Sequence, residues 1–273
     1  MKKIFIIFIT IFVGANLSAQ SYEELVNKSF DFADAKDYTG AELTLKQAMR
    51  LEPDNPMNSA LLLNLGTYQR NLGKLDEALI SYNAALGRSP QATFLLHNRA
   101  ALYCEMGSYD NALIDYSSIL AKDPDDMEAL YRRALIFTTR GGLLEAEADF
   151  NKILAKDPEN LDAKSGLAML LKRREQWEEA EIAYTYLLSK NKSNAELYFQ
   201  RAEAYFQQKK LARTLEDLSK ALSLGYDYPT LYILRGRVRL AQYDKYSAKQ
   251  DFLKAQEMGA QEDIIEPLLK LCK

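Results

Sequence analysis

The sequence repeats itself with a period of 34 residues, and this period limits the possible folds more than any other feature. An alanine marks the period at Ala78, Ala112, Ala146 and Ala180, and Thr214 and Ala248 continue the series. Four residues after each of these stands a large apolar side chain, in the order Tyr82, Tyr116, Phe150, Tyr184, Leu218 and Phe252. Twelve residues before each stands a small one, in the order Gly66, Ala100, Ala134, Ala168, Ala202 and Gly236. An earlier copy begins at Tyr22, so one unit occurs seven times along the chain.

Each copy has the pattern of two amphipathic helices. Apolar residues recur three and four places apart in both halves of a copy, as they do on one face of an α-helix. The connections between the halves carry Gly73, Gly107 and Gly141, and glycine favours turns. One helix pair cannot bury its apolar face alone, so neighbouring copies must stack. The sequence therefore predicts an all-α solenoid.

This pattern resembles the tetratricopeptide repeat over about residues 22 to 260. Counted from the first residue of each copy, the family's small residue at position 8, alanine at 20, aromatic residue at 24 and proline at 32 are all visible. The proline is Pro53, Pro90, Pro124 and Pro158 in the first four copies, and Lys192, Tyr226 and Ala260 replace it in the last three. The resemblance implies a right-handed α-solenoid of seven helix pairs, with the first helix of each pair on the inner face.

The same alignment gives the expected domain bounds. The seven copies cover about residues 22–55, 59–92, 93–126, 127–160, 161–194, 195–228 and 229–260. Residues 261–273 follow them, and the apolar residues in this segment predict a C-terminal capping helix over the exposed end of the last pair.

The segment 1–19 has the order of a secretory signal peptide. Lys2 and Lys3 precede a largely apolar run from Ile4 to Val13, and small and polar residues lead to Ala19. The apolar run is too short for a membrane-spanning helix, which needs about 20 residues. We expect cleavage after Ala19, in a sequence similar to signals common in Bacteroidetes. The mature chain would then have no transmembrane segment and would lie in the periplasm or cell envelope.

An arginine and an aspartate occur together in four copies and are absent together from the other three. The arginines at position 7 are Arg99, Arg133, Arg201 and Arg235, and the aspartates at position 23 are Asp115, Asp149, Asp217 and Asp251. This covariation between copies predicts an ion pair between the two helices of each pair. An anion-binding ladder of arginines is the alternative, although an arginine already paired with a carboxylate is poorly available to a ligand.

The inner face offers the candidate binding residues, because positions 2, 5, 6, 9, 12 and 13 of the first helices differ between copies. From the aromatic, amide and charged residues at these positions we select as candidates Phe94, His97, Asn98, Tyr131, Arg132, Lys172, Arg173, Phe199, Gln200 and Glu203. We expect these side chains to be free of packing in the repeat core, and such side chains suit a groove for a protein or peptide. Asn98 and Arg132 match two positions of the clamp with which some family members hold a carboxyl-terminal tail. Leu63 and Glu128 replace clamp residues, which favours another kind of partner.

The residue types exclude several classes of function. With 35 basic and 38 acidic residues, the chain lacks the basic excess of a nucleic-acid-binding protein. His97 is the single histidine, no paired cysteine–histidine spacing indicates a metal, and no catalytic set or cofactor motif is found. We therefore expect a non-enzymatic scaffold or adaptor that holds a protein partner without a cofactor. A carbohydrate- or peptidoglycan-binding module is the alternative, because tyrosines and amides also bind sugars.

Overall fold

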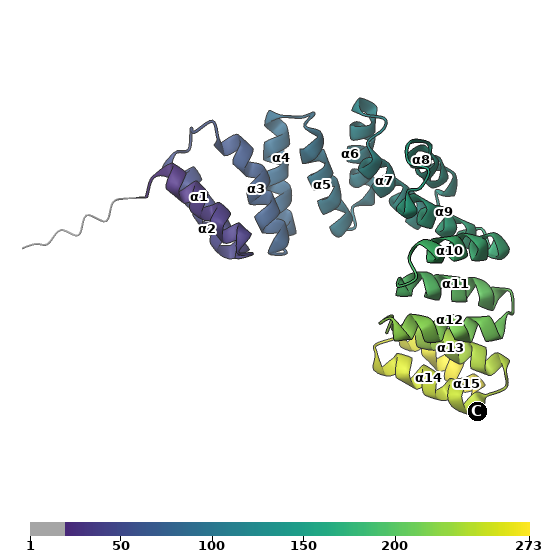
Figure 1. Cartoon of the computed structure of the whole chain (residues 1–273). Helices are drawn as coiled ribbons and strands as arrows, with labels where there is room; N and C mark the ends of the chain where they lie inside the picture. The colour runs from purple at the N-terminus through teal and green to yellow at the C-terminus, as the bar shows by residue number, and fades with distance from the viewer. Residues whose placement is uncertain (1–19) are drawn as a thin grey trace, which may run out of the picture. The chain divides into compact units, whose positions relative to one another are not determined.

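The computed structural model describes residues 20–273, and that range is helical throughout its regular structure (Figure 1). The signal peptide predicted for residues 1–19 lies outside the described residues. Fifteen helices follow one another within residues 20–273: α1 (Tyr22–Asp34), α2 (Tyr38–Leu51), α3 (Asn58–Asn71), α4 (Leu75–Arg88), α5 (Thr93–Glu105), α6 (Tyr109–Lys122), α7 (Met127–Arg140), α8 (Leu143–Lys156), α9 (Leu161–Arg173), α10 (Trp177–Lys190), α11 (Ala195–Gln207), α12 (Leu211–Ser223), α13 (Pro229–Ala241), α14 (Lys245–Glu257) and α15 (Glu262–Leu271). Among them, none combines the length and the apolar character that crossing a membrane requires.

The helices form the consecutive pairs of an α-solenoid, in chain order from α1 with α2 to α13 with α14, and hydrogen bonds from Arg99 to Asp115 join α5 to α6. The small residue at position 8 lets the two helices of a pair approach each other closely. A Cβ atom added to Gly66 would lie 2.6 Å from the ring of Tyr82, and one added to Gly236 would lie 2.5 Å from the ring of Phe252. Both rings are fully buried, so the small and large residues of the period meet inside each pair.

A left-handed residue reverses the chain between the two helices of every pair. Position 15 has a φ between +59° and +85° in all seven copies: Lys36, Gly73, Gly107, Gly141, Glu175, Lys209 and Tyr243. The three glycines are the ones that the sequence pattern identifies as turns. In the other four copies an ordinary side chain accepts this conformation, which costs roughly 1–2 kcal/mol per residue.

The helices pack into two compact units, and the division falls inside α6, after Asp115. In the first unit, Leu45 and Leu61 belong to one buried cluster. In the second unit, Phe252 and Ile265 belong to another. Ile265 comes from α15 and is fully buried, so this last helix covers the apolar end of the seventh pair, as the sequence predicts.

Candidate functional site

All four arginine–aspartate pairs indicated by the covariation are formed. In the pair of α7 and α8, Arg133 Nε donates to Asp149 Oδ2 at 2.8 Å and Arg133 Nη2 donates to Asp149 Oδ1 at 2.8 Å. The side chain of Asp149 is 4% exposed, and that of Arg133 is 20% exposed. Arg99 with Asp115 and Arg201 with Asp217 have the same two-bond arrangement. In the fourth pair, Arg235 Nε donates to both carboxylate oxygens of Asp251 and Arg235 Nη2 donates to Asp251 Oδ1.

Three of these arginines make a further contact that the sequence pattern did not reveal. The remaining nitrogen, Nη1, donates to a polar side chain at position 25 of the preceding copy: Arg99 to Asn83, Arg133 to Ser117 and Arg201 to Thr185. The hydrogen bond with its aspartate raises the pKa of Arg99 and likewise that of Arg201. Each of these guanidinium groups therefore ties three helices together, which argues against an anion-binding ladder.

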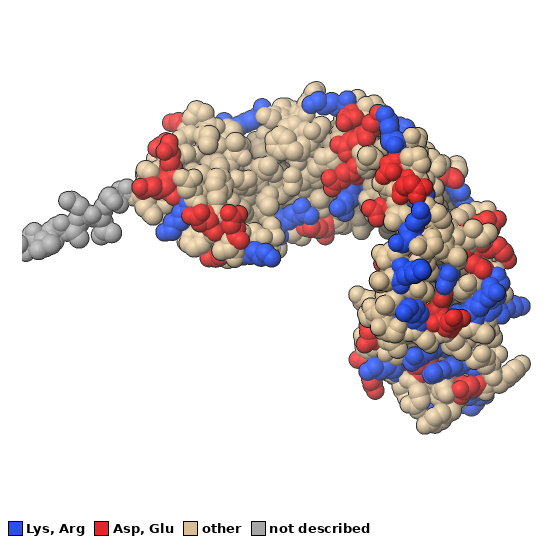
Figure 2. All heavy atoms as spheres, viewed as in Figure 1, with Lys and Arg blue, Asp and Glu red and all other residues tan. Residues whose placement is uncertain are grey.

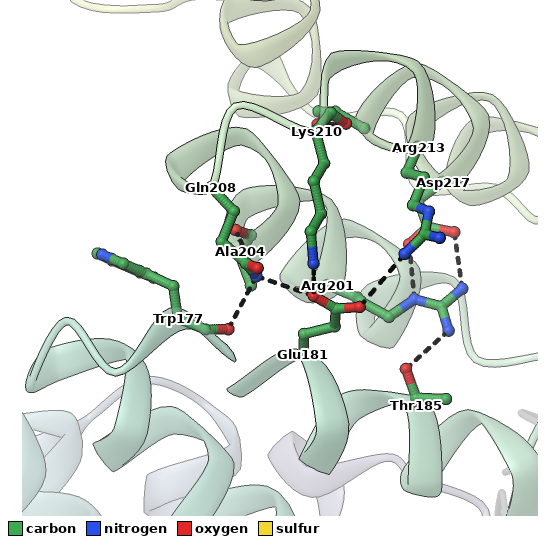
Figure 3. A network of polar contacts seen from close by, with 10 residues as sticks. Trp177, Glu181, Thr185, Arg201, Ala204, Gln208, Lys210, Arg213 and Asp217 are labelled. Carbon is green, nitrogen blue, oxygen red and sulfur yellow. Dashed lines mark hydrogen bonds and ion pairs between the residues drawn. The ribbon is translucent and has the colours of Figure 1, made fainter. Parts of the chain in front are cut away.

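A second polar network joins the fifth and sixth copies, and Figure 3 shows it from close by. Glu181 on α10 accepts hydrogen bonds from Lys210 Nζ at 2.6 Å and from Gln208 Nε2 at 2.9 Å. Burial raises the pKa of Glu181, but the hydrogen bonds from Lys210 and Gln208 outweigh burial and the net shift is downward. Glu42 in the first copy and Glu147 in the fourth occupy the same position and pair with Lys74 and Arg174 of the following copies. These carboxylates lock successive copies together.

A groove of about 580 Å³ opens on the first helices of the fifth, sixth and seventh copies, within the second unit. Half of the predicted binding residues line it: Lys172 and Arg173 from α9, and Phe199, Gln200 and Glu203 from α11. Its other lining residues are not among the predicted binding residues: Met169, Tyr226, Thr230, Ile233, Leu234, Arg237 and Ile264. Ile264 lies on α15, so the capping helix also forms part of the groove wall.

The prediction that the Phe199 side chain is free of packing is wrong. Its side chain is 5% exposed and belongs to a buried cluster of the second unit. The ring stacks on that of Tyr226 with centroids 4.7 Å apart, and Tyr226 meets Tyr228 edge-on at 4.8 Å. Tyr226 is the residue that replaces the family's proline in the sixth copy, so the loss of that proline supplies the ring that covers Phe199. The two rings form the apolar floor of the groove.

The polar residues of this groove fall into two groups. Lys172 Nζ donates to Gln200 Oε1 and forms an ion pair with Glu203, so these three side chains bind one another across α9 and α11. Arg173 and Arg237 are exposed and have no ion pair with any residue in the range 20–273. The two guanidinium groups are therefore the available cations of the groove.

A second groove, of about 330 Å³, lies beside the first and shares Met169 and Gln200 with it. Tyr131 lines this groove, but its ring also lies 6.1 Å from that of the buried Phe150. Burial raises the pKa of Tyr131, and the negative charge of Asp162 raises it further. Both observations place the Tyr131 side chain partly in the core.

The four remaining predicted residues lie outside these two grooves. Arg132 is exposed on α7, where its Nε is 3.7 Å from a carboxylate oxygen of Glu128. Phe94, His97 and Asn98 lie on α5 and belong to the first unit. The Phe94 side chain is 57% exposed. The side-chain amide of Asn98 donates to the backbone carbonyl of Phe94 at 2.7 Å. The structure therefore gathers five predicted residues in one groove and places a sixth, Tyr131, in the neighbouring groove, which shares Gln200 with the first.

No arrangement within residues 20–273 brings together three histidine, cysteine, aspartate or glutamate side chains in a way that could hold a metal ion.

Known proteins similar to this chain share its repeat. The tetratricopeptide repeat family matches residues 31–93, 98–160 and 165–230. A tetratricopeptide repeat protein of known structure from Parabacteroides merdae is 45% identical, with a TM-score of 0.80 over 93% of this chain and 99% of the other. PilW, described as a widely conserved type IV pilus biogenesis factor, is 18% identical, with a TM-score of 0.68 over 77% of this chain and 98% of its own, a likeness of fold alone.

One further relative matches a short part of the sequence. RNA polymerase II-associated protein 3 of Xenopus tropicalis is 40% identical over 65 residues, which are 24% of this chain and 10% of that protein. The chain belongs to the tetratricopeptide repeat family.

Proposed function

We propose that this protein is a non-enzymatic scaffold of the periplasm or cell envelope that holds a protein partner in the two grooves of its second unit. The observation that carries the proposal is the position of five independently predicted residues around one groove. The repeat pattern assigns positions 8, 20 and 24 to packing, and the groove is built mainly from other positions of the first helices. A binding surface can therefore change from copy to copy without disturbing the solenoid.

The chemistry of the larger groove suits a protein segment. Its floor of Phe199 and Tyr226 is apolar, and its rim carries charged and amide groups. Apolar anchors surrounded by polar residues are the arrangement in which a few side chains supply most of the binding free energy. The face drawn in Figure 2 carries both signs of charge, with basic side chains gathered around α11, rather than one continuous basic surface. That pattern supports a protein rather than a nucleic acid as the partner.

The cellular location rests on the sequence of residues 1–19. If the signal peptide is removed as expected, mass spectrometry of the native protein should find an amino terminus at or near Gln20. A native protein that retains Met1 to Ala19 would contradict export by cleavage.

The proposed function is tested by cross-linking inside the cell. A photoreactive amino acid replaces Thr230, which is exposed in the groove, and in a matched variant it replaces Ile182, which is 70% exposed on α10. We expect discrete protein adducts from position 230 and far fewer from position 182. Equal adducts from both positions would overturn the site. Retention of the protein on sedimented cell wall, without protein adducts, would instead support the carbohydrate-binding alternative.

A further inference from the structure

The two adjoining grooves of the second unit carry opposite charges. Asp162 and Glu196 line the smaller groove, and neither forms an ion pair with another residue in the described range. Arg173 and Arg237 line the larger groove and are also exposed and without such a pair. The remaining charged residues that line the larger groove, Lys172 and Glu203, neutralise each other. The combined surface therefore has an acidic end and a basic end.

The charges near Tyr131 agree with an acidic end in the smaller groove. Besides burial, the charges of Asp162 and Glu196 raise the pKa of Tyr131, although Arg132 acts in the opposite direction. Glu196 and Glu203 also raise the pKa of Tyr226 in the larger groove, so the basic end rests on the exposed Arg173 and Arg237 and not on the surroundings of that tyrosine.

Helix dipoles explain only part of this pattern. Asp162 and Glu196 lie in the first turns of α9 and α11, and Arg173 lies in the last turn of α9, where each charge stabilises its helix. Arg237 is in the middle of α13, and its guanidinium carbon lies 5.7 Å from the centroid of the Phe206 ring. No helix end accounts for a positive charge there, at the rim of an apolar groove.

The two charged ends are connected by an apolar and amide surface. Met169 and Gln200 line both grooves, so the two hollows adjoin. Beyond them, Phe199 and Tyr226 form the floor at the basic end. A ligand that occupies both grooves must therefore place apolar side chains between two regions of opposite charge.

We propose that the joined grooves select an extended protein segment with basic residues at one end, acidic residues at the other and apolar residues between them. This inference rests on the proposed scaffold function and names the chemistry of the partner. Basic side chains of the segment meet Asp162 and Glu196, and its acidic side chains meet Arg173 and Arg237. Unlike charges across such a surface favour one orientation of the segment and oppose the other.

The test uses capped peptides, because capping removes the terminal charges. The probe is acetyl-Lys-Lys-Leu-Ser-Phe-Ser-Leu-Glu-Glu-amide, and three comparison peptides have only lysine, only glutamate or only glutamine at both ends. Binding to the chain from Gln20 to Lys273 is measured by calorimetry at low and high salt. We expect the bipolar peptide to bind about tenfold more tightly than the glutamine peptide at low salt, with a smaller advantage at high salt because exposed charges are screened.

Charge-reversal variants distinguish charge-dependent selection of the peptide from non-specific binding. Arg173→Glu with Arg237→Glu makes both ends acidic, so the all-lysine peptide should become the tightest ligand. Asp162→Lys with Glu196→Lys makes both ends basic, so the all-glutamate peptide should become the tightest. Arg237→Glu alone, away from any helix end, should give part of the first change without loss of folding. The control, Arg50→Glu with Arg88→Glu on the first unit, should leave the order of the peptides unchanged.

Two results separate this inference from the function on which it rests. If the bipolar peptide binds no better than the glutamine peptide, or if charge reversal leaves the order unchanged, the polarity is wrong, even while adducts from position 230 keep the scaffold function intact. If position 230 gives no protein adducts, the scaffold function itself fails at this site.

Discussion

Replacing Arg133 by leucine should lower the free energy of unfolding by about 2 to 3 kcal/mol. Arg133 makes two hydrogen bonds of 2.8 Å to Asp149, whose side chain is 4% exposed. Removing one partner of a fully buried ion pair costs about 3–5 kcal/mol, because the other charge stays buried without compensation. The outer edge of Arg133 is 20% exposed, so water can reach the orphaned carboxylate and we expect the cost near or below the low end of that range.

The assay is equilibrium urea unfolding followed by circular dichroism. Because stacked repeats need not unfold in one step, hydrogen exchange of the amides in α7 and α8 supplies the local free energy. Arg132→Leu is the matched control, since Arg132 directly precedes Arg133 in the sequence and its side chain is 54% exposed. The control should change the free energy by less than about 0.5 kcal/mol.

A second variant tests the physical reason for the loss. The fifth copy carries Leu167 and Ala183 at the two positions of the pair, so the fold accepts apolar residues there. Arg133→Leu combined with Asp149→Ala should therefore recover much of the stability lost by the single variant. If the single variant costs no more than Arg132→Leu, or if the double variant is no better than the single one, a buried unpaired carboxylate is not the cause.

Three further predictions concern packing, turns and pH. Gly166→Ala should lower the free energy of unfolding by about 2 kcal/mol, because the new methyl group would lie 2.3 Å from the Phe150 ring. In the control Gly87→Ala in α4, the methyl group meets no atom within 4 Å, so the free energy of unfolding should rise by about 0.5 kcal/mol. Equal effects in urea unfolding would contradict this packing argument. Tyr243→Gly should raise the free energy of unfolding by about 0.5–1 kcal/mol, because Tyr243 has a φ of +64° and is 91% exposed; a loss would show that its ring stabilises the turn. Burial raises the pKa of Glu181, but hydrogen bonds from neighbouring lysine and amide side chains lower it below the ordinary 4.5, so its stabilising contribution is present above that pH and is lost as the pH falls through the folded value. Glu181→Gln should therefore lower the urea midpoint at neutral pH and converge with the wild type once the pH falls below the folded pKa of Glu181; parallel curves at all pH values would refute the linkage.

The period alone was enough to predict the solenoid, because it records which residues must be small and which must be large. Positions 8 and 24 meet inside each pair, and any chain that keeps Gly66 opposite Tyr82 can repeat that contact. Covariation between copies also predicted the ion pairs, because an arginine and its aspartate lie in adjacent helices of one pair. Both signals come from contacts that recur, so seven copies in one chain report them repeatedly.

The sequence predicted less where one copy departs from the rest. Lys36 and Tyr243 adopt a left-handed conformation that only glycine makes visible in a sequence. Phe199 was expected to be free of packing, and Tyr226 covers it from a position where the repeat usually has proline. Arg237 was missed although it occupies position 9 of the seventh copy, one of the variable positions, because the repeat pattern does not show which copies form the groove. Features that belong to one copy require the three-dimensional arrangement before they can be identified.

The groove also shows how packing and binding are coupled at a single residue. At position 6 of the first helix, the fourth and sixth copies carry Arg132 and Gln200, while the fifth carries Gly166. The ring of Phe150 fills the space beside Gly166 and lies near Tyr131, so this glycine keeps the smaller groove open while the core extends beneath it. A methyl group there would push against the Phe150 ring and would disturb the groove wall at the same time. The wall of the smaller groove therefore depends on the absence of a side chain in one copy.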